Sequence, residues 1–460
     1  MSALWTSADA EAATLGRATR AFDVAGLSID TRTLQPGDLY VALKGDTRDG
    51  HDFVKAAFAA KAAAALVSRK PDGVAEEPLL MVANTLRGLE DMTRASRARS
   101  HAKIVAVTGS AGKTTTKEML RLAFGALGQT HASAASYNNH WGVPLSIASM
   151  PRDAQFGIFE IGMNHFGEIR PLVGFARPHA ALVTTIAPAH LEFFGTCEAI
   201  ADAKSEIFEG IVPGGAALIP ADSSYADRLK ARAKQAGVSR ILTFGEKTGS
   251  DARLIATSQI ESGMKLDAQI LGRPLSFRIG APGAHIASNA MGALLAVAAV
   301  DGDLLNAAAA LSSFSALKGR GARFRVSVGD GSAEVIDESY NANPASMAAA
   351  LALLGSAQTK GRRIAVLGDM LEMGPDGPTH HAALARDIEA ARVDLVFANG
   401  AQMKSLWDVL PASRRGAYGE KSVDIASALM SALRAGDVVL VKGSLGSRMA
   451  VIIDALKARG

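Results

Sequence analysis

The sequence predicts an α/β fold with three domains, and three observations support this prediction. The length of 460 residues corresponds to about three domains of typical size, and 48% hydrophobic residues are enough to form large cores. Short apolar runs alternate with helical patterns through most of the chain, which is typical of parallel sheets covered by helices. One of these runs continues through two glycines into a lysine and three threonines at 109–116.

The first domain is predicted to span residues 1–99 and to be a small α/β unit. The apolar run at 38–43 predicts a strand, and the alanine-rich stretch at 54–67 predicts a helix. The charged stretch that follows ends at Arg99 and is expected to be a basic linker to the next domain.

Two larger α/β domains are predicted to follow. The central domain, residues 100–318, should contain a parallel sheet covered on both faces, with strands at 104–107, 157–161, 181–186, 216–219 and 241–244. The C-terminal domain, residues 319–460, repeats this alternation and should have a Rossmann-like α/β fold, with strands at 363–368, 394–398 and 437–441.

The composition excludes several classes of protein. Lysine and arginine exceed aspartate and glutamate by only 49 − 45 = 4 residues and form no long basic run, so no nucleic-acid partner is expected. The single cysteine, Cys197, excludes an internal disulfide framework. Asp9 and Glu11 lie where a signal peptide would be basic and then apolar, and the most apolar helical stretch, 290–300, is shorter than the roughly 20 residues that cross a bilayer. We therefore expect a cytoplasmic protein without a transmembrane segment.

The stretch at 103–116 predicts a buried strand, a glycine turn and a helix that begins at a lysine. The glycines allow backbone N–H groups to approach phosphate oxygens, the helix presents its positive end, and the lysine adds a cation. Val107 replaces the first glycine of the common pattern, which leaves a shorter G-x-x-G-K-T form. Such a turn can also simply separate a strand from a helix, but the lysine and threonines favour a triphosphate site. Its residues are Gly109, Ser110, Ala111, Gly112, Lys113, Thr114 and Thr115.

Polar side chains follow two further apolar runs of the central domain. Glu160 ends one run and His190 follows another. Functional residues gather at the carboxyl ends of parallel strands, so both are expected near the phosphate loop, where they can help to bind magnesium. Either residue taken alone can equally be structural or exposed. Lys204 lies in a helical pattern that ends at Gly210, and taken by itself it is best interpreted as a solvated lysine paired with a carboxylate.

Together these motifs resemble the ATP-dependent Mur ligases of peptidoglycan synthesis. The matching stretches are 109–116 (GSAGKTTT), 138–145 (NNHWGVPL), 160–169 (EIGMNHFGEI), 187–195 (APAHLEFFG) and 203–208 (AKSEIF). Further stretches are similar to the MurF branch of that family, namely 28–32 (SIDTR), 36–45 (PGDLYVALKG), 337–344 (DESYNANP), 367–374 (LGDMLEMG) and 441–444 (VKGS). The similarity covers nearly the whole chain.

The resemblance implies two magnesium ions in the site. Thr114 or Thr115 would join Glu160 on one ion, and His190 would join Lys204 on the second. The family's lysine at this position is carbamylated by carbon dioxide. A lysine with a depressed pKa offers the neutral amine that reacts, and the resulting carbamate is an anionic oxygen ligand.

The resemblance also implies how ATP is held. Lys113 would contact the terminal phosphates, and an arginine of the C-terminal domain would approach them from the far side. Glu338 replaces an aspartate of the family that is placed at the ribose. The expected ATP-binding residues beyond the phosphate loop are Asn289 at the adenine, Arg320 or Arg323, Glu338 and Tyr340.

The N-terminal domain would bind the UDP end of the second substrate. An arginine can pair with diphosphate through two hydrogen bonds, although exposed surface charge is the usual role of such a motif. The expected residues there are Ser28, Asp30, Thr31 and Arg32. Asn139 and His165 would line the muramoyl-peptide cleft, and the C-terminal residues expected to meet substrate are Asn343, Asp369, Lys442 and Ser444.

The implied reaction joins D-alanyl-D-alanine to UDP-N-acetylmuramoyl-tripeptide through an acyl phosphate, at the expense of ATP. We expect a monomer whose outer domains close on the central one. Two alternatives stay open: another Mur or folylpolyglutamate-type ligase, and a phosphate-loop switch ATPase. The three-domain length and the run at 340–343 argue against the first, and Lys204 and the C-terminal domain argue against the second.

Overall fold

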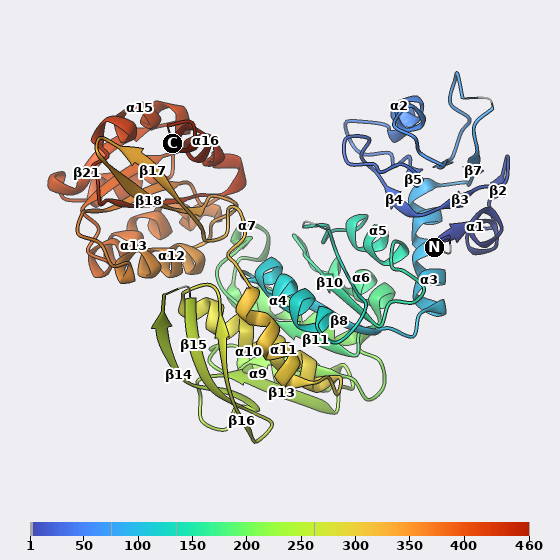
Figure 1. Ribbon diagram of the computed structural model, residues 1–460, viewed down its shortest axis with the longest axis horizontal. Coiled ribbons are helices and arrows are strands. Elements are labelled where there is room, and N and C mark those ends of the chain that lie inside the picture. Colours follow the sequence, from blue (N-terminus) through green and yellow to red (C-terminus); the bar gives the residue numbers. More distant parts are fainter. Residues whose placement is uncertain (1–2, 75, 135, 262, 460) are drawn as a thin grey trace.

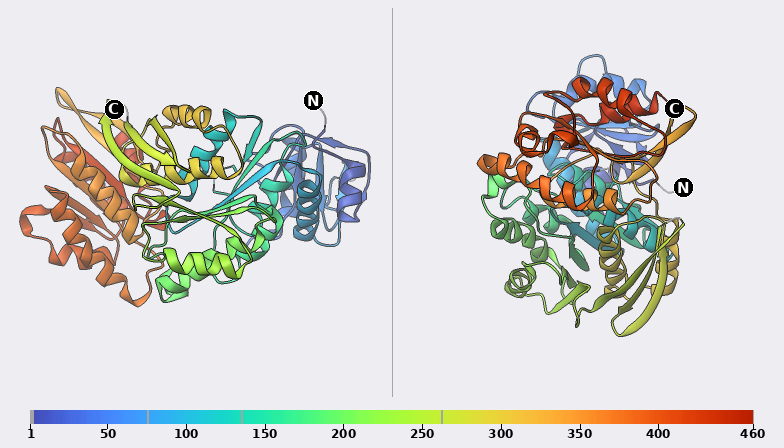
Figure 2. Two further views of the ribbon diagram at one scale, coloured as in Figure 1. Left: turned by 90° about the horizontal axis from the view of Figure 1, so that it is seen from below. Right: turned by 90° about the vertical axis from the view of Figure 1, so that its left-hand side faces the viewer.

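The computed structural model describes residues 3–74, 76–134, 136–261 and 263–459. Three lobes form an elongated, V-shaped arrangement, with the central lobe between the N-terminal lobe, in blue, and the C-terminal lobe, in red (Figure 1). The view from below shows the same elongated arrangement (Figure 2). The main sheets of the lobes contain five, nine and six strands, so the predicted α/β class is confirmed. Within the described ranges, no helix is both long and apolar enough to span a membrane.

The N-terminal lobe consists of short elements: β1 (Trp5–Thr6), α1 (Ser7–Thr14), β2 (Arg17–Ala18), β3 (Asp23–Val24), β4 (Gly26–Ser28), β5 (Asp38–Val41), α2 (Val54–Ala59), β6 (Ala64–Val67), β7 (Leu79–Met81) and α3 (Thr85–Arg99). Five strands form a sheet in the order β2-β7-β6-β5-β4, which is parallel except for the β2–β7 pair. Strands β1 and β3 form a separate antiparallel pair.

The predicted helix at 54–67 is wrong. Helix α2 ends at Ala59, and β6 is a fully buried strand that pairs in parallel with β5. A short run of alanines buried on both faces carries no periodicity that separates a strand from a helix. Lys61, with a φ of 69°, leaves the helical conformation between the two elements.

The predicted basic linker before residue 100 is also wrong, because this stretch forms α3. Its Thr93 and Ser96 hydroxyls donate hydrogen bonds to the carbonyls of Pro144 and Ile147 at 2.9 and 2.8 Å. The charged side chains occupy the exposed face of an amphipathic helix whose other face is buried. Helix α3 therefore attaches the first lobe to the second.

The central lobe contains β8 (Lys103–Thr108), α4 (Lys113–Gly125), β9 (Thr130–Ala132), α5 (Gly142–Ala148), β10 (Phe156–Glu160), α6 (Ile169–Ala176), β11 (Ala180–Val183), α7 (Leu191–Phe194), α8 (Cys197–Ser205), β12 (Ala216–Pro220), α9 (Ala226–Gln235), β13 (Arg240–Gly245), β14 (Ala252–Ile260), β15 (Gly263–Ile270), β16 (Arg273–Ile279), α10 (Ala284–Ala299) and α11 (Leu304–Ala310). The strand order is β16-β15-β14-β13-β12-β11-β8-β10-β9.

Helices cover both faces of this sheet, as predicted. Helices α4, α10 and α11 pack on one face, and α5, α6, α8 and α9 pack on the other. The two antiparallel pairs β14–β15 and β15–β16, which extend the parallel sheet at one edge, were not predicted. Their alternation of buried and exposed residues is that of a sheet with one solvated face, and such strands contain no continuous apolar run.

The C-terminal lobe contains β17 (Ala322–Val328), β18 (Gly331–Glu338), α12 (Pro344–Ser356), β19 (Arg363–Gly368), α13 (Gly377–Ala390), β20 (Leu395–Asn399), α14 (Met403–Val409), β21 (Arg415–Gly419), α15 (Ser422–Ala432), β22 (Val438–Lys442) and α16 (Ala450–Lys457). Its strand order is β17-β18-β22-β19-β20-β21, parallel except for the edge strand β17. Helices α12 to α14 pack on one face, and α15 and α16 pack on the other.

Candidate active site

The phosphate loop, residues 109–112, joins the end of β8 to the start of α4. Strand β8 lies between β10 and β11 and runs parallel to both, so the loops after these three strands meet at one edge of the sheet. Gly109 and Gly112 have φ angles of 151° and 80°. A side chain at Gly109 would collide with Thr184, and one at Gly112 would press on the amide of Asn289. Both glycines are therefore required for the shape of the loop.

Lys113 begins α4 and is partly buried beside the loop. Its ammonium donates a hydrogen bond to the Gly109 carbonyl at 2.7 Å. Burial lowers the pKa of Lys113, the nearby charge of Arg320 lowers it further, and Glu160 opposes the shift. A partly buried cation beside backbone N–H groups attracts the negative charge of a triphosphate.

Glu160, at the end of β10, faces the first turn of α4. Its carboxylate accepts hydrogen bonds from the Thr114 hydroxyl at 2.8 Å and from the Asn138 amide at 2.7 Å. Thr115 is buried in the same turn. A hydroxyl and a carboxylate provide the hard oxygen ligands that Mg²⁺ prefers. The described part of the chain contains no group of three or more His, Cys, Asp or Glu side chains placed to hold a metal, so an ion here would need further oxygens from a bound phosphate.

Lys204 lies near the end of α8 and is only 1% exposed. Burial lowers the pKa of Lys204 well below its ordinary value, and the positive charge of Lys113 lowers it further. The structure thus brings the two lysines together, and it favours the neutral amine of Lys204. The interpretation of Lys204 as a solvated lysine is wrong. A neutral amine fits the chemistry of a carbamate, and the protonated form does not.

His190 lies before α7 with a φ of 58°, in the left-handed region. Its Nδ1 is 2.5 Å from the Glu372 carboxylate of the C-terminal lobe. A carboxylate on Nδ1 fixes the tautomer and leaves Nε2 available as a ligand. The Glu192 N–H donates to the Glu372 carbonyl at 3.2 Å, so the central and C-terminal lobes touch directly at this imidazole.

Three residues of the C-terminal lobe face the central lobe, and one of them bonds directly to the phosphate loop. The Arg320 guanidinium lies 3.9 Å from the centroid of the Tyr340 ring, and its charge acts on Lys113. The Tyr340 hydroxyl donates to Ser136 Oγ at 2.9 Å, and the Asn343 amide donates to the Ser110 carbonyl at 3.1 Å. Of the two arginines left open by the sequence, the structure brings Arg320 to the loop.

Arg323 lies on β17, where it pairs with Glu334 at 3.0 Å. Glu338 and Lys442 form a second pair, with the ammonium 3.4 Å from the carboxylate. Lys442 also donates to the Asn341 carbonyl at 2.9 Å. Burial lowers the pKa of Lys442, whereas the charge of Glu338 opposes the shift. Glu338, which was expected at the ribose, and Lys442, which was expected at the substrate, thus contact each other.

Asp369 and Ser444 are held by the framework of the C-terminal lobe. The Asp369 carboxylate accepts hydrogen bonds from the backbone N–H groups of Gln402 and Met403 at 3.3 and 2.8 Å, at the start of α14. The Ser444 hydroxyl accepts a hydrogen bond from Leu371 N–H at 3.0 Å. Both side chains thus have a structural role, because they accept hydrogen bonds from N–H groups that would otherwise be unpaired.

In the N-terminal lobe, Asp30 and Arg32 form a two-pronged pair, and Thr31 lies between them. The guanidinium of Arg32, helped by its own backbone N–H, lowers the pKa of Asp30 to about 2. The Ser28 hydroxyl supports this turn by donating to the Asp30 carbonyl at 3.0 Å. Arg32 also interacts electrostatically with Tyr137 of the central lobe, so this turn faces the loop that carries Asn138.

Of the two predicted cleft residues, one is hydrogen-bonded at the start of a helix and the other is exposed. The Asn139 side chain accepts a hydrogen bond from Gly142 N–H at 2.9 Å at the start of α5, so its oxygen serves that helix. The His165 ring is exposed, with its centroid 4.7 Å from that of Phe193 and its Nδ1 3.1 Å from Glu168. The neighbouring Asn138, which was not singled out, is the residue that contacts Glu160.

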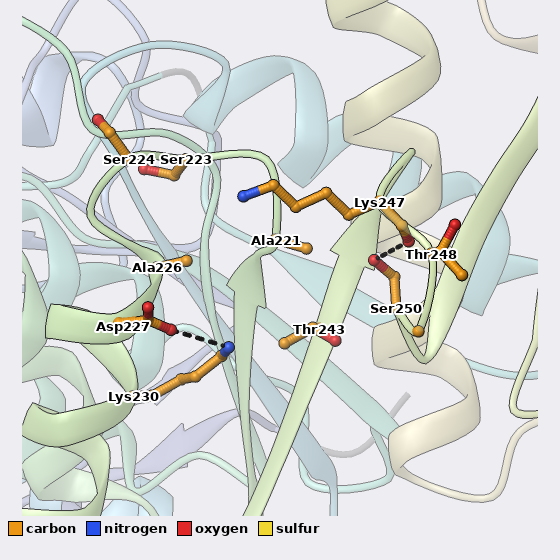
Figure 3. Close-up of a pocket in the computed structure, with 11 residues that line it drawn as sticks. Ala221, Ser223, Ser224, Ala226, Asp227, Lys230, Thr243, Lys247, Thr248 and Ser250 are labelled. Carbon is orange, nitrogen blue, oxygen red and sulfur yellow. Dashed lines mark hydrogen bonds and ion pairs between the residues drawn. The ribbon is translucent and has the colours of Figure 1, made fainter.

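A cavity of about 230 Å³ lies apart from these residues, beyond the ends of β12 and β13 (Figure 3). Its charged lining includes Lys230, which pairs with Asp227 at 3.2 Å, and Lys247. None of the predicted site residues lines it. The candidate site is therefore the edge of the central sheet at the phosphate loop.

Family models match three stretches of the chain. They are described as "Mur ligase family, catalytic domain" at residues 23–104, "Mur ligase middle domain" at 107–297 and "Mur ligase, glutamate ligase domain" at 322–445. A UDP-N-acetylmuramoyl-tripeptide–D-alanyl-D-alanine ligase of Rickettsia prowazekii is 31% identical, and the alignment covers 93% of this chain and 94% of the relative. The chain belongs to the Mur ligase family.

Two further comparisons extend this result across the whole chain. The Bacillus subtilis ligase of the same name is 33% identical over 94% of this chain and 93% of its own length. The crystal structure of MurF from Acinetobacter baumannii has a TM-score of 0.85 at 28% identity and covers 99% of both chains. The similarity therefore includes all three lobes of this Mur ligase, in the same order.

Proposed function

We propose that this Mur ligase joins D-alanyl-D-alanine to UDP-N-acetylmuramoyl-tripeptide at the expense of ATP. The observation that carries this proposal is the meeting of Lys113, Glu160 and Lys204 at one edge of the central sheet. A switch ATPase needs Lys113 and Glu160, but its reaction does not require Lys204, a further lysine with a lowered pKa. Curated relatives with this activity align along almost the whole chain.

In the proposed reaction, a carboxylate oxygen of the tripeptide attacks the γ-phosphorus of ATP, and ADP leaves. The amine of D-alanyl-D-alanine then attacks the acyl carbon, phosphate leaves, and the amine loses a proton. Lys113 and Arg320 supply positive charge from opposite lobes while negative charge gathers between the two anionic reactants. Activation as an acyl phosphate replaces hydroxide, a poor leaving group, by phosphate.

The chemistry of the donors would suit two magnesium ions. Thr114, Thr115 and Glu160 would offer oxygens to one of them. His190 offers Nε2, and Lys204 would offer carbamate oxygens after its neutral amine has formed a bond to carbon dioxide and lost a proton. Bound magnesium would neutralise phosphate charge and polarise the phosphoryl oxygens. The carbamate would in addition place an anion where the fold otherwise favours a neutral amine.

We also propose that the three lobes correspond to the predicted domains 1–99, 100–318 and 319–460, and that the enzyme acts in the cytoplasm as a monomer. The turn at 28–32 would hold the UDP end, because its Arg32 interacts with Tyr137 of the central lobe, and the exposed His165 would hold the peptide end. Asn289, buried against Gly112, and the Glu338 and Tyr340 side chains would contact the nucleoside of ATP.

Phosphate release with each combination of substrates tests the proposal. We expect release only when ATP, magnesium, UDP-N-acetylmuramoyl-tripeptide and D-alanyl-D-alanine are all present, with one amide bond formed per phosphate. Release that needs glutamate or a diamino acid in place of the dipeptide would identify a different ligase. Release from ATP alone at the full rate would identify an ATPase.

A further inference from the structure

Asn343 lies where the C-terminal lobe meets the phosphate loop, and both ends of its side-chain amide are engaged. It is the N-cap of α12, where its Oδ1 accepts a hydrogen bond from Ser346 N–H at 2.9 Å. Its Nδ2 donates to the Ser110 carbonyl at 3.1 Å across the boundary between the lobes. Asn343 is only 6% exposed. Asn343 thus makes its contacts within the protein, and its expected role in binding substrate stays a prediction.

Ser110 is held on its other sides by the central lobe. Its Oγ exchanges hydrogen bonds with the carbonyl and N–H of Ala187 at 2.9 and 3.0 Å, and its N–H donates to Thr185. Its carbonyl is the atom that Asn343 holds. The loop is thus fixed jointly by two lobes.

The peptide bond between Ser110 and Ala111 connects this contact to the phosphate site. Because a trans peptide is planar, its C=O and N–H point in opposite directions. A donor that holds the Ser110 carbonyl therefore turns the Ala111 N–H away from Asn343. Among the described residues, this N–H has no hydrogen-bond acceptor, so it is available to a ligand. Loop N–H groups of this kind bind phosphate oxygens.

We propose that Asn343 is a positioning residue that sets the Ser110–Ala111 peptide plane from the C-terminal lobe and so aims an N–H at the phosphates of ATP. Docking of the C-terminal lobe then also sets the shape of the phosphate site. Two neighbouring contacts support a docked boundary, since Tyr340 bonds to Ser136 and Arg320 lies on the Tyr340 ring. The inference rests on the proposed function only in taking ATP as the ligand.

Asn343→Ser tests the proposal, because serine keeps an N-cap acceptor but lacks the arm that reaches Ser110. The matched control is Ser346→Ala, which removes the returning hydroxyl of the same cap and leaves the loop contact in place. Full-length proteins are compared by calorimetric titration with magnesium and either a non-hydrolysable ATP analogue or AMP. Loss of one neutral hydrogen bond predicts binding of the analogue about two- to tenfold weaker in Asn343→Ser. AMP should bind all three proteins alike.

Wild-type affinity of Asn343→Ser for the analogue would overturn the proposal, as would an equal loss for AMP or an equal loss in Ser346→Ala. If Asn343→Ser folds poorly, Asn343→Asp replaces it. The aspartate carboxylate keeps the cap but places an acceptor against the Ser110 carbonyl. This substitution should therefore weaken binding of the analogue at least as much as Asn343→Ser does. Wild-type protein that binds the analogue but makes no amide with both substrates would contradict the proposed function and leave the role of Asn343 standing.

Discussion

The central and C-terminal sheets both end their parallel strands in polar residues, but they use these residues differently. In the central lobe, Lys113 and Lys204 lie together, and no carboxylate is among the causes that set the pKa of Lys204. In the C-terminal lobe, Asp369 and Lys442 are engaged by backbone groups or by an opposite charge. A polar residue at the carboxyl end of a strand is thus a candidate for a catalytic role. Whether other groups of the protein already pair with its side chain distinguishes a catalytic residue from a structural one.

The two buried lysines make this comparison sharpest. Burial is the main cause of a lowered pKa in both Lys204 and Lys442. The second cause differs in sign, because Lys113 lowers the pKa of Lys204 further, whereas Glu338 raises that of Lys442. A protonated Lys204 is therefore unfavourable in the fold, and a protonated Lys442 is partly compensated.

The largest expected effect is the loss of ligation in Lys204→Ala. Removal of a proposed metal ligand should lower kcat by at least about 100-fold, more than the loss of an outer partner of such a ligand costs. Short carboxylates such as acetate should restore part of the rate by replacing the carbamate. Phosphate release is the measurement, and Lys230→Ala, at a side chain that is 39% exposed, is the control. Full activity of Lys204→Ala without added carboxylate would exclude the carbamate.

The second prediction compares the stability of Lys204→Met and Lys442→Met in buffer free of carbon dioxide. Lys442→Met leaves the partly buried Glu338 without its partner and should lower the free energy of unfolding by about 1–3 kcal/mol. Lys204→Met removes an unfavourable charge and should raise the free energy of unfolding near pH 7. Urea unfolding measures both effects. Equal destabilisation of the two variants would show that the two lysines have equivalent surroundings.

The pH dependence of Lys204→Met follows from the sign of the pKa shift. A lysine with a folded pKa below its unfolded value of 10.5 binds more protons when unfolded, so the stability of the wild type rises as the pH rises towards 10.5. The advantage of methionine should accordingly be greatest at neutral pH and shrink towards pH 10. An advantage that grows with pH would contradict the lowered pKa.

The third prediction concerns Asp369, which holds the start of α14. Asp369→Asn exchanges one acceptor oxygen for a donor facing the Gln402 and Met403 N–H groups, and should cost about 1–2 kcal/mol of stability. The affinity for an ATP analogue should stay unchanged. Thermal unfolding and titration of the analogue measure the two quantities. A tenfold loss of affinity at unchanged stability would show that Asp369 acts in binding the ligand.

Much of the fold could be predicted because strands buried on both faces leave continuous apolar runs, and because the glycine–lysine loop requires its own geometry. The shared edge that brings Glu160 to Thr114 follows from parallel topology. The alanine-rich β6 and the half-exposed β14–β16 lack such a signal.

The contacts between lobes could not be predicted from the sequence. The doublet Asn138–Asn139 was recognised, but one residue of register in a loop decides which amide meets Glu160. The pairing of His190 with Glu372 joins residues 182 positions apart, and no spacing pattern indicates it. The loop contact of Asn343 likewise depends on how two lobes dock.

The smallest expected effect distinguishes two carboxylates of the N-terminal lobe that share a pKa of about 2, Asp30 and Asp49. The side chain of Arg32 is the main cause for Asp30, whereas the His51 backbone N–H is the main cause for Asp49, with Arg69 contributing less. Arg32→Ala should therefore raise the pKa of Asp30 towards 3.8, and Arg69→Ala should move that of Asp49 less. Carboxyl titration by nuclear magnetic resonance measures both.

The stability that the Asp30–Arg32 pair contributes is present above the unfolded pKa of 3.8 and is lost as the pH falls through about 2, because the folded pKa is the lower one. Arg32→Ala and wild type should thus differ slightly at pH 7 and converge near pH 2. The difference is small since the Arg32 side chain is 84% exposed. A strong stability loss at pH 7 would mean that Arg32 holds the first lobe against the second, and its proposed availability to a diphosphate would then be wrong.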